Sequence, residues 1–448
     1  MISDKSAGLR RVIALPHATA MVVGTIIGAS IFVQPSEITA RVPNPLFILL
    51  VWILSGVITC FGALVCAELA SIFPKTGGVY VYLMEAYSPS IGFLWGWAMF
   101  WSMHSGIIAA ISVICARYVA YFYPMNSIGI TTIAILVITV ISAINYIGVK
   151  EGSTLQTLFT AGKLAAIAVI LVIGLAFGSR IPEHFISRGF ENSYLSIKDF
   201  LLALVAGLFT FGGWHMVTYS AEETINPRKT IPRALIIGMI IVTVCYLALN
   251  TVYMYILPLD VLASSTKIAA DAADALFGGG GGGLMAGLVI FSSIGSLFGI
   301  ILAGPRVYYI MAQEGLLFRW IGEIHPHYRT PSKAIILQAI WSSVLVATGT
   351  YRELFTRVVY TEWIFFGLMA MGIFILRRRP GIVITHNISG YPYIPALFII
   401  SSFAIVINQI ISDPLESLYG LSIILIGLPV YYLWVKKRIG RSELNVYN

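Results

Sequence analysis

Charged residues are scarce in this chain. Only 11% of its 448 residues are Asp, Glu, Lys or Arg, whereas 58% are apolar and the mean hydropathy is +0.88. Ordinary globular domains carry roughly 25% charged residues, so the composition excludes a soluble or disordered protein and indicates an all-α integral membrane protein. Apolar segments of about 20 residues recur along nearly the whole length, which suits membrane-spanning helices and is too long for barrel strands.

Cysteine is equally rare. The four cysteines, Cys60, Cys66, Cys115 and Cys245, all lie in apolar segments without the spacing of metal ligands. We therefore expect free thiols, no disulfide framework, no metal site and no cofactor.

The motifs of several protein classes are also missing. The sequence has no nucleophile elbow, no HExxH and no phosphate-binding Gly-Lys-Ser/Thr, so no enzyme activity is predicted. A channel would need a selectivity ring or a continuous polar stripe, and neither is visible. Residues 1–16 lack a separate apolar core with a cleavage site, so no cleavable signal peptide is expected. Transporters, sensors and structural membrane proteins are the classes that remain.

Twelve segments are predicted to form transmembrane helices. They cover residues 16–40, 46–70, 91–122, 128–147, 154–178, 198–221, 233–257, 284–313, 333–349, 358–376, 394–412 and 419–435. Segment 71–90, between the second and third of these, is too short and polar to span, and we expect it to lie in the membrane interface.

The positions of the basic residues indicate the orientation of these helices in the membrane. A net charge of +8 could indicate nucleic-acid binding, but the lysines and arginines lie mostly between apolar segments, as Arg228, Arg233 and Arg377 do. Most of them fall on one side when alternate loops are compared. The positive-inside rule then predicts a multi-pass protein of the plasma membrane, of a prokaryotic cell in our interpretation, with both termini in the cytoplasm.

Two of the predicted helices are interrupted in the middle by small residues. The interruptions lie within residues 24–32 and 209–214. In a membrane, a broken helix is tolerated only where it is buried in protein or lines a cavity. Broken helices in corresponding positions of two halves indicate the substrate site of a transporter. Close helix packing through small residues is the alternative explanation, but two such breaks together favour a site.

The chemistry of the breaks indicates a ligand. Unwinding at Gly28, Ala29 and Ser30 frees N–H groups at the start of the next half-helix, which suit a carboxylate. Unwinding after Phe209 frees carbonyl groups, which suit an ammonium group. An α-amino acid carries both groups.

An ionisable residue inside an apolar segment is a candidate functional residue. Lys163 lies in the middle of segment 154–178. The alternative is that its amine snorkels to the interface. Two histidines are weaker candidates, because His104 fits a satisfied core position and His215 fits either the pocket wall or a neighbouring helix.

Several short motifs resemble one known family in their order and spacing. In chain order, these motifs cover residues 24–32, residues 68–69 with 74–78, residues 159–164, residues 209–214, residues 222–224 with 226–227, Tyr246 with Asn250, residues 295–298 with Arg306, and Arg377. Together they resemble the amino acid–polyamine–organocation superfamily, and within it the L-type amino acid transporters and their bacterial exchanger relatives.

The resemblance implies a fold. A single transporter domain over 1–448 would hold a LeuT-like five-plus-five inverted repeat with broken helices 1 and 6. The repeats would cover 12–178 and 198–379, followed by two extra helices over 394–436.

The resemblance also implies site roles. The substrate-binding residues would be Ile26, Ile27, Gly28, Ala29, Ser30, Phe209, Thr210, Phe211 and Gly212. Backbone groups of 27–30 would hold the substrate carboxylate, and carbonyls of Ile26, Phe209 and Phe211 its amino group. Phe209 would be the aromatic gate. The family's first break usually reads Gly-Ser-Gly, whereas Gly-Ala-Ser stands here, so a Cβ at Ser30 would narrow the pocket and limit positive φ.

Lys163 would replace the sodium ion of Na⁺-coupled relatives. It would donate to a carbonyl near Gly24 or Thr25 and to serines of the eighth helix, namely Ser292, Ser293 or Ser296. Tyr246 would bond to Lys163 or to the substrate region.

The expected function is Na⁺-independent transport of neutral L-amino acids by alternating access, as a 1:1 exchanger. Neutral substrates are favoured, because the sequence offers no acidic residue for the pocket. His215 and Ser30 indicate a modest polar pocket, which suits small substrates such as alanine, serine, cysteine and threonine. Proton-coupled symport and transport of cationic amino acids or polyamines are the alternatives. The expected partners are the substrate and membrane lipid, without nucleic acid. The loop over 123–127 lacks the cysteine that links animal L-type transporters to a glycoprotein, so no disulfide-linked heavy subunit is expected.

Overall fold

The computed structural model describes residues 13–147, 152–177, 196–277, 281–328, 330–384, 386–388 and 390–444. In these residues the chain is helical, and only one isolated β-bridge joins Ile13 to Thr224. Ten helices in the described part are long and apolar enough to cross a membrane. Two shorter apolar helices, Leu15–Ile26 and Ser332–Thr348, occupy the positions of the first and ninth expected spans. The all-helical membrane class is confirmed. The chain ends, to which the predicted cytoplasmic location refers, lie largely outside the described residues.

The described helical elements follow in this order along the chain. The elements are α1 (Leu15–Ile26), η1 (Ser30–Phe32), α2 (Gln34–Arg41), α3 (Pro45–Ile72), α4 (Val79–Ala86), α5 (Pro89–Ala98), η2 (Met99–Met103), α6 (His104–Phe122), α7 (Ser127–Ile147), α8 (Gly152–Phe177), α10 (Ile197–Thr210), η3 (Trp214–Glu223), α11 (Pro227–Ile256), α12 (Leu259–Ser264), α13 (Ile268–Phe277), α14 (Gly281–Gln313), η4 (Arg319–Gly322), α15 (Ser332–Thr348), α16 (Tyr351–Arg377), α17 (Tyr393–Ser412) and α18 (Pro414–Leu444).

Local sequence signals set several helix starts. The Asn44 side chain caps α3 by accepting hydrogen bonds from the N–H groups of Leu46 and Phe47. Thr350 and Glu353 form a capping box at the start of α16. Each cap satisfies backbone donors that have no partner inside the helix.

Both predicted breaks are present. Helix α1 ends at Ile26, and the chain continues through the short 3₁₀ turn η1 into α2. Helix α10 ends at Thr210 and is followed by η3. Gly213 lies between them with φ +95°, and a Cβ there would lie 3.1 Å from the Thr25 carbonyl oxygen. Only glycine fits, because the left-handed backbone and this close approach both exclude a side chain.

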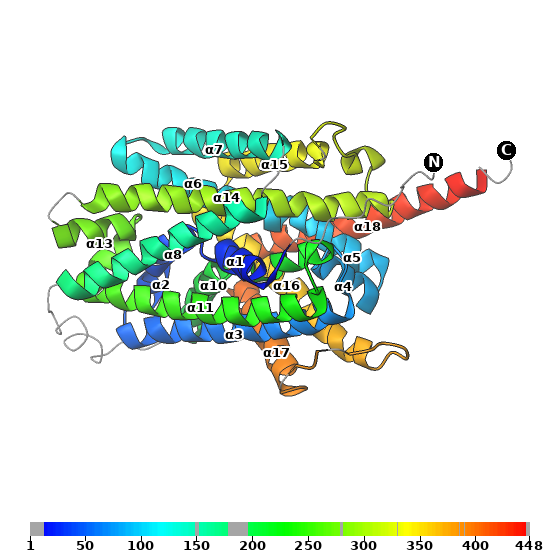
Figure 1. Ribbon diagram of the computed structural model, residues 1–448, viewed down its shortest axis with the longest axis horizontal. Helices are drawn as coiled ribbons and strands as arrows, with labels where there is room; N and C mark the ends of the chain where they lie inside the picture. Colours follow the sequence, from blue (N-terminus) through cyan, green and yellow to red (C-terminus); the bar gives the residue numbers. More distant parts are fainter. Residues whose placement is uncertain are drawn as a thin grey trace.

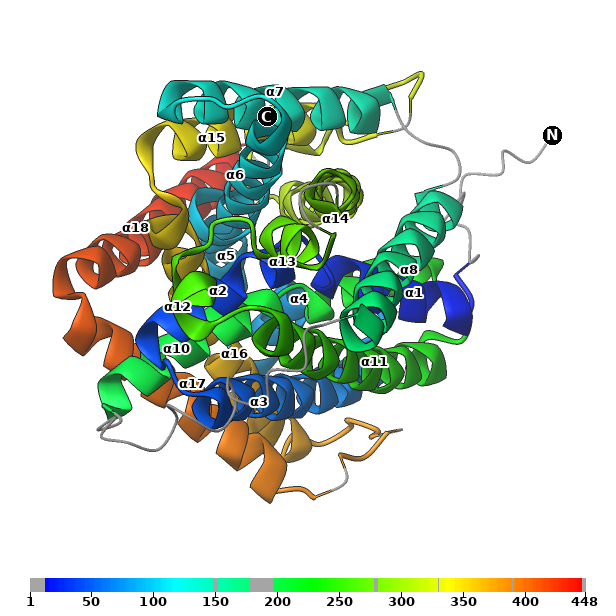
Figure 2. The same cartoon turned by 90° about the vertical axis from the view of Figure 1, so that its left-hand side faces the viewer.

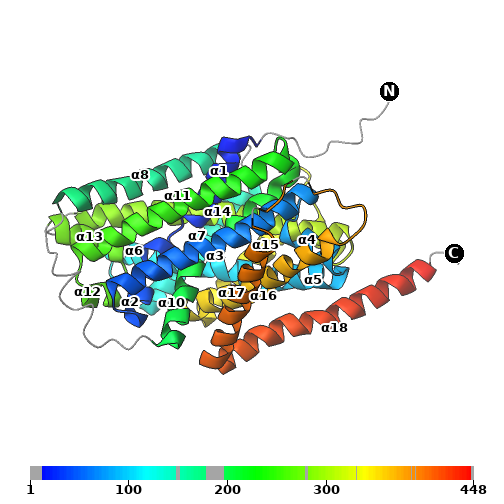
Figure 3. The same cartoon turned by 90° about the horizontal axis from the view of Figure 1, so that it is seen from below.

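The broken segments lie inside a bundle of long helices (Figure 1). Helix α1 packs against α8, α11, α14 and η3, whereas α10 packs against α2, α3 and α16. Helices α7 and α15 lie side by side at one edge (Figure 2). Helix α18 runs along the outside of the bundle and extends beyond it (Figure 3). The two breaks are therefore enclosed by other helices.

Segment 71–90 contains the eight-residue helix α4, whose residues Tyr80, Tyr82 and Leu83 are almost completely buried. Gly78, with φ +50°, makes the turn into α4, and a Cβ there would lie 2.2 Å from the Thr218 hydroxyl oxygen. Helix α4 packs into the protein against α5 and α16. Its expected place in the membrane interface stays a prediction.

The third expected span is also less regular than predicted. A five-residue π-helix, η2, separates α5 from α6. Directly after it, the His104 Nε2 atom lies 2.7 Å from the Ile300 carbonyl oxygen of α14. The core interpretation of His104 is thereby confirmed. π-Segments are frequent near functional sites.

Two acidic residues, Glu68 and Glu223, pair with arginines of other helices, and of the two Glu68 is the fully buried one. The fully buried Glu68 of α3 accepts hydrogen bonds from Arg377 Nε at 2.7 Å and Nη2 at 2.6 Å. Glu223 accepts from Arg306 Nη2 at 3.2 Å. Glu222 accepts instead from the Thr76 backbone N–H at 3.4 Å. Such pairs compensate charges that would be costly if left single.

Candidate functional site

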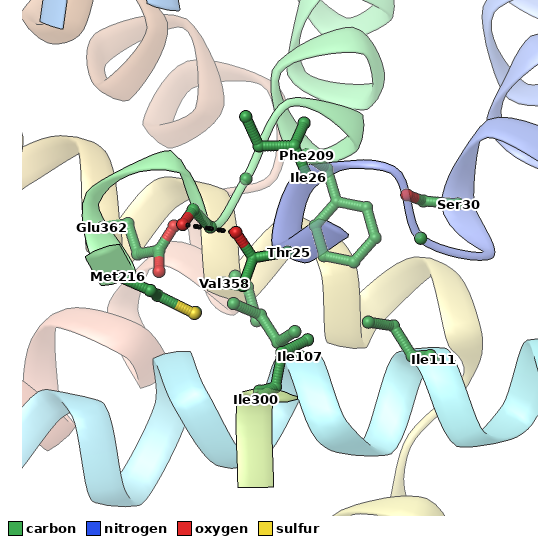
Figure 4. Close-up of a pocket in the computed structure, with 13 residues that line it drawn as sticks. Thr25, Ile26, Ser30, Ile107, Ile111, Phe209, Met216, Ile300, Val358 and Glu362 are labelled. Carbon is green, nitrogen blue, oxygen red and sulfur yellow. Dashed lines mark hydrogen bonds between the residues drawn. The ribbon is translucent and has the colours of Figure 1, made fainter. Parts of the chain in front are cut away.

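A narrow cavity lies between the two breaks (Figure 4). Its walls come from both breaks and from α6, α14 and α16. The lining residues are Thr25, Ile26, Gly28, Ser30, Ile107, Ile111, Phe209, Gly212, Gly213, Met216, Ile300, Val358 and Glu362. About 20 Å³ is open to the centres of water-sized molecules, which is room for about one water. A larger ligand requires the walls to move apart.

The first break supplies hydrogen-bond donors. The N–H groups of Phe32 and Val33 bond to the carbonyls of Ala29 and Ser30. The Gly28 N–H already bonds to the Ile26 carbonyl. The N–H groups of Ala29, Ser30 and Ile31 stand at the start of η1, where a helix provides no partner of its own. Among the described residues only Asn226 has positive φ without being glycine, so Ser30 fits here without backbone strain. Of the two effects expected when Gly-Ser-Gly is replaced by Gly-Ala-Ser, the limit on positive φ does not arise, and the narrower pocket remains.

Tyr246 of α11 bridges the two breaks. Its hydroxyl lies 2.9 Å from the Ile26 carbonyl oxygen and 3.1 Å from the Thr210 carbonyl oxygen, with one proton to donate to either. Of the two expected contacts, the one with the break region is present. The Thr25 hydroxyl adds a second link at 3.2 Å from the Gly213 carbonyl oxygen. Both links satisfy carbonyls that the helix interruptions release.

The expected acceptor carbonyls are partly occupied. The Ile26 oxygen also accepts from the Gly28 N–H at 2.7 Å, and the Phe209 oxygen accepts from the Gly212 N–H at 3.0 Å. A carbonyl oxygen has two lone pairs, so the Phe209 oxygen retains capacity for a further donor. At Ile26 a ligand amine would compete with Tyr246.

Lys163 of α8 ties the first break to two other helices. It is 2% exposed, and its Nζ atom donates to the Gly24 carbonyl at 2.9 Å and to Ser296 Oγ at 2.6 Å. The Ser296 hydroxyl in turn lies 3.4 Å from the Ile27 carbonyl oxygen. The burial and both contacts exclude snorkelling to the interface.

The other two candidate serines of α14 lie apart from this contact. Ser293 donates to the Val289 carbonyl of its own helix at 2.7 Å. Ser292 Oγ is buried without a hydrogen-bond partner in the described part of the chain. Only Ser296 therefore joins Lys163.

The aromatic residues of the second break face different ways. Phe209 lines the cavity and packs against Phe355, with ring centroids 5.5 Å apart. Phe211 packs instead against Trp52 and Tyr246, with centroids 6.4 and 5.0 Å away. Of the predicted binding residues, those lining the cavity are Ile26, Gly28, Ser30, Phe209 and Gly212. Four others are buried behind its wall, namely Ile27, Ala29, Thr210 and Phe211.

An acidic residue in the cavity wall escaped the sequence analysis. Glu362 of α16 lines the cavity and is only 5% exposed. The expectation that no acidic residue serves the pocket is therefore wrong. The signal was available, because Glu362 stands inside an apolar span, the same criterion that identified Lys163. Conversely, His215 does not line the cavity, since its ring lies among Trp95, Tyr219 and Phe366.

The described residues hold no group of three or more His, Cys, Asp or Glu side chains that could bind a metal ion. The chemistry of the site rests on backbone dipoles, hydroxyls, one ammonium and one carboxyl group.

Comparisons with known proteins agree with this geometry. The amino acid permease family matches residues 13–431. The serine/threonine exchanger SteT of Bacillus subtilis is 34% identical over 437 residues, covering 96% of this chain and 98% of the relative. The human b(0,+)-type amino acid transporter 1 is 32% identical, covering 98% and 91%. The human cystine/glutamate transporter is 30% identical, covering 95% and 86%.

The bridge made by Tyr246 can be tested through stability. Tyr246→Phe should lower the stability of the detergent-purified protein by about 1–3 kcal/mol, because it leaves buried carbonyls short of a donor. Tyr253→Phe is the matched control. Tyr253 is buried on the same helix, and its hydroxyl has no hydrogen-bond partner among the described residues. The Tyr253→Phe substitution should therefore leave the stability unchanged or raise it slightly. Equal melting temperatures for the two variants would contradict the assigned bridge.

Proposed function

The chain belongs to the amino acid permease family, and from this premise we propose that it is a Na⁺-independent amino acid exchanger of the cell membrane. It works by alternating access and favours small neutral L-amino acids. One observation carries the proposal: two broken helices face each other across one cavity, with N–H donors on one side and carbonyl acceptors on the other. These groups match the carboxylate and ammonium of an amino acid.

The relatives support this assignment. One relative is a serine/threonine exchanger, and others are amino acid transporters. We infer the five-plus-five repeat, twelve spans, cytoplasmic termini and an unpartnered subunit as parts of the same proposal. The apolar walls at Ile107, Ile300 and Val358 suit the aliphatic part of an amino acid side chain.

We assign Lys163 the place of a structural cation. Its ammonium group links α8 to α1 and α14 through Gly24 and Ser296. A sodium ion between these helices would use the same kind of oxygen ligands. With the ammonium fixed there, sodium is not needed to hold the broken helix.

Exchange is tested in proteoliposomes. Vesicles loaded with unlabelled serine should take up labelled serine several-fold faster than empty vesicles, because the loaded carrier returns faster than the empty one. Equal uptake into loaded and empty vesicles would overturn the exchange mechanism. Uptake into empty vesicles that follows an inward proton gradient would support symport instead.

Lys163→Met should slow transport more than it weakens substrate binding. Hydrogen bonds from a charged donor contribute about 1.5–3 kcal/mol, so their loss should shift the balance between conformations by about tenfold or more. Initial exchange rates and thermal-shift binding measure the two effects.

Ser293→Ala is the control for Lys163→Met. The Ser293 hydroxyl bonds only within α14, so this variant should transport normally. Replacing Na⁺ by choline should leave the unmodified protein unaffected, and strict Na⁺ dependence would refute the role given to Lys163.

Phe209→Ala should raise the KM for exchange or abolish it, because we propose that this ring closes the cavity over the substrate. Truncating a buried aromatic side chain also costs about 3–5 kcal/mol of packing. Phe93→Ala controls for this cost. Phe93 is buried against Trp97 and Tyr431, away from the cavity. A folded Phe209→Ala protein with an unchanged KM would rule out the gate.

A further inference from the structure

The cavity carries one carboxyl group, at the end away from Ser30. Figure 4 shows Glu362 and Met216 on one side and Ser30 on the other. Glu362 follows Val358 by one helical turn of α16, so both project from the same face into the cavity. The side chain is 95% removed from solvent, as its relative exposure of 5% shows.

This carboxyl group is uncompensated. Within the described residues, no hydrogen bond or ion pair reaches Glu362, whereas Glu68 and Glu223 are each paired with an arginine. The amine of Lys163 is held by Gly24 and Ser296 instead. A single buried carboxylate is unfavourable in a low-dielectric surrounding. The group can therefore either carry a proton or ionise beside a bound cation that the described chain does not supply.

The titratable groups nearby do not supply it either. Tyr219 of η3, which interacts electrostatically with Glu362, is buried with its hydroxyl 3.8 Å from Met99 Sδ. His104 of α6 contacts the Ile300 carbonyl, and His215 of η3 stacks edge-on against Trp95. None of these three is paired with the carboxyl group.

The walls between the first break and Glu362 are apolar. Ile107, Ile300 and Val358 line this stretch. Methylene groups match such walls, and a charged tip can then reach a polar partner at the end.

We propose that Glu362 determines specificity by binding the ammonium or guanidinium end of a cationic amino acid side chain. The inference rests on the proposed exchange function and extends its substrates from small neutral to cationic amino acids. The backbone of the substrate lies at the breaks, its methylenes lie along the apolar walls, and its cationic tip pairs with Glu362. With a neutral substrate the carboxyl group takes a proton in place of that tip.

The test compares two substrates on the full-length protein in proteoliposomes. Exchange of labelled lysine and of labelled serine is measured at pH 7 for the unmodified protein and for Glu362→Gln. The lysine-to-serine ratio of exchange rates should fall by about tenfold or more in the variant, because charged hydrogen bonds to a desolvated group are the strong ones.

Two further variants keep the result interpretable. Glu362→Asp retains the charge on a stem one methylene shorter, and it should preserve lysine exchange and shift the preference toward the longer arginine. Asp260→Asn removes an exposed carboxylate of α12 and should leave the lysine-to-serine ratio unchanged. A ratio that falls equally in Asp260→Asn would assign the effect to general surface charge and overturn the proposal.

The remaining outcomes separate this inference from the proposed function. Serine exchange without any lysine or arginine exchange in the unmodified protein would overturn the inference and leave the exchanger intact. Loss of a proton-driven serine uptake in Glu362→Gln, with no cationic substrate carried, would reassign the residue to proton coupling and overturn it as well. If the unmodified protein exchanges neither amino acid, the proposed function itself fails.

Discussion

Every backbone N–H and C=O group released inside a membrane must find a partner within the protein, and this constraint organises the centre of the molecule. Interrupting α1 and α10 releases such groups in a region that the bundle closes to lipid. Side chains from other helices form hydrogen bonds with these released backbone groups. Tyr246 reaches both interruptions, and Lys163 reaches the Gly24 carbonyl. Unwound backbone persists here because α8, α11 and α14 hold it.

The same contacts couple the site to the surrounding helices. Lys163 and Ser296 fix α8 and α14 to the first break, while Tyr246 fixes α11 to both breaks. A movement of any of these helices therefore changes the geometry of the cavity. Where such contacts have two alternative arrangements, a small ligand can bias the arrangement of a whole bundle. The narrow cavity fits this view, since a substrate can enter only when the walls separate.

Charge in the membrane falls into two classes in this structure. Glu68 and Glu223 are paired with arginines at helix ends, where they hold the bundle together. Lys163 and Glu362 lie at the centre. Lys163 is satisfied by neutral oxygens of the chain, whereas Glu362 has no such partner in the described residues. A satisfied group suits a structural role and an unsatisfied one suits a ligand.

The contact of Lys163 near Gly24 was implied by the family resemblance. Composition and local patterns alone were enough for the membrane class, the two breaks and the buried lysine. These features depend on the length of apolar segments, on runs of small residues and on the cost of placing a charge in lipid. Each of them can be recognised from consecutive residues of the sequence. Three features depended on packing between distant segments. They are the burial of α4, the separation of Phe209 from Phe211, and the position of Glu362 in the cavity wall. A helix that is apolar on all sides does not reveal which face meets a cavity, so only the tertiary arrangement of α16 beside the breaks could bring the carboxyl group to the site.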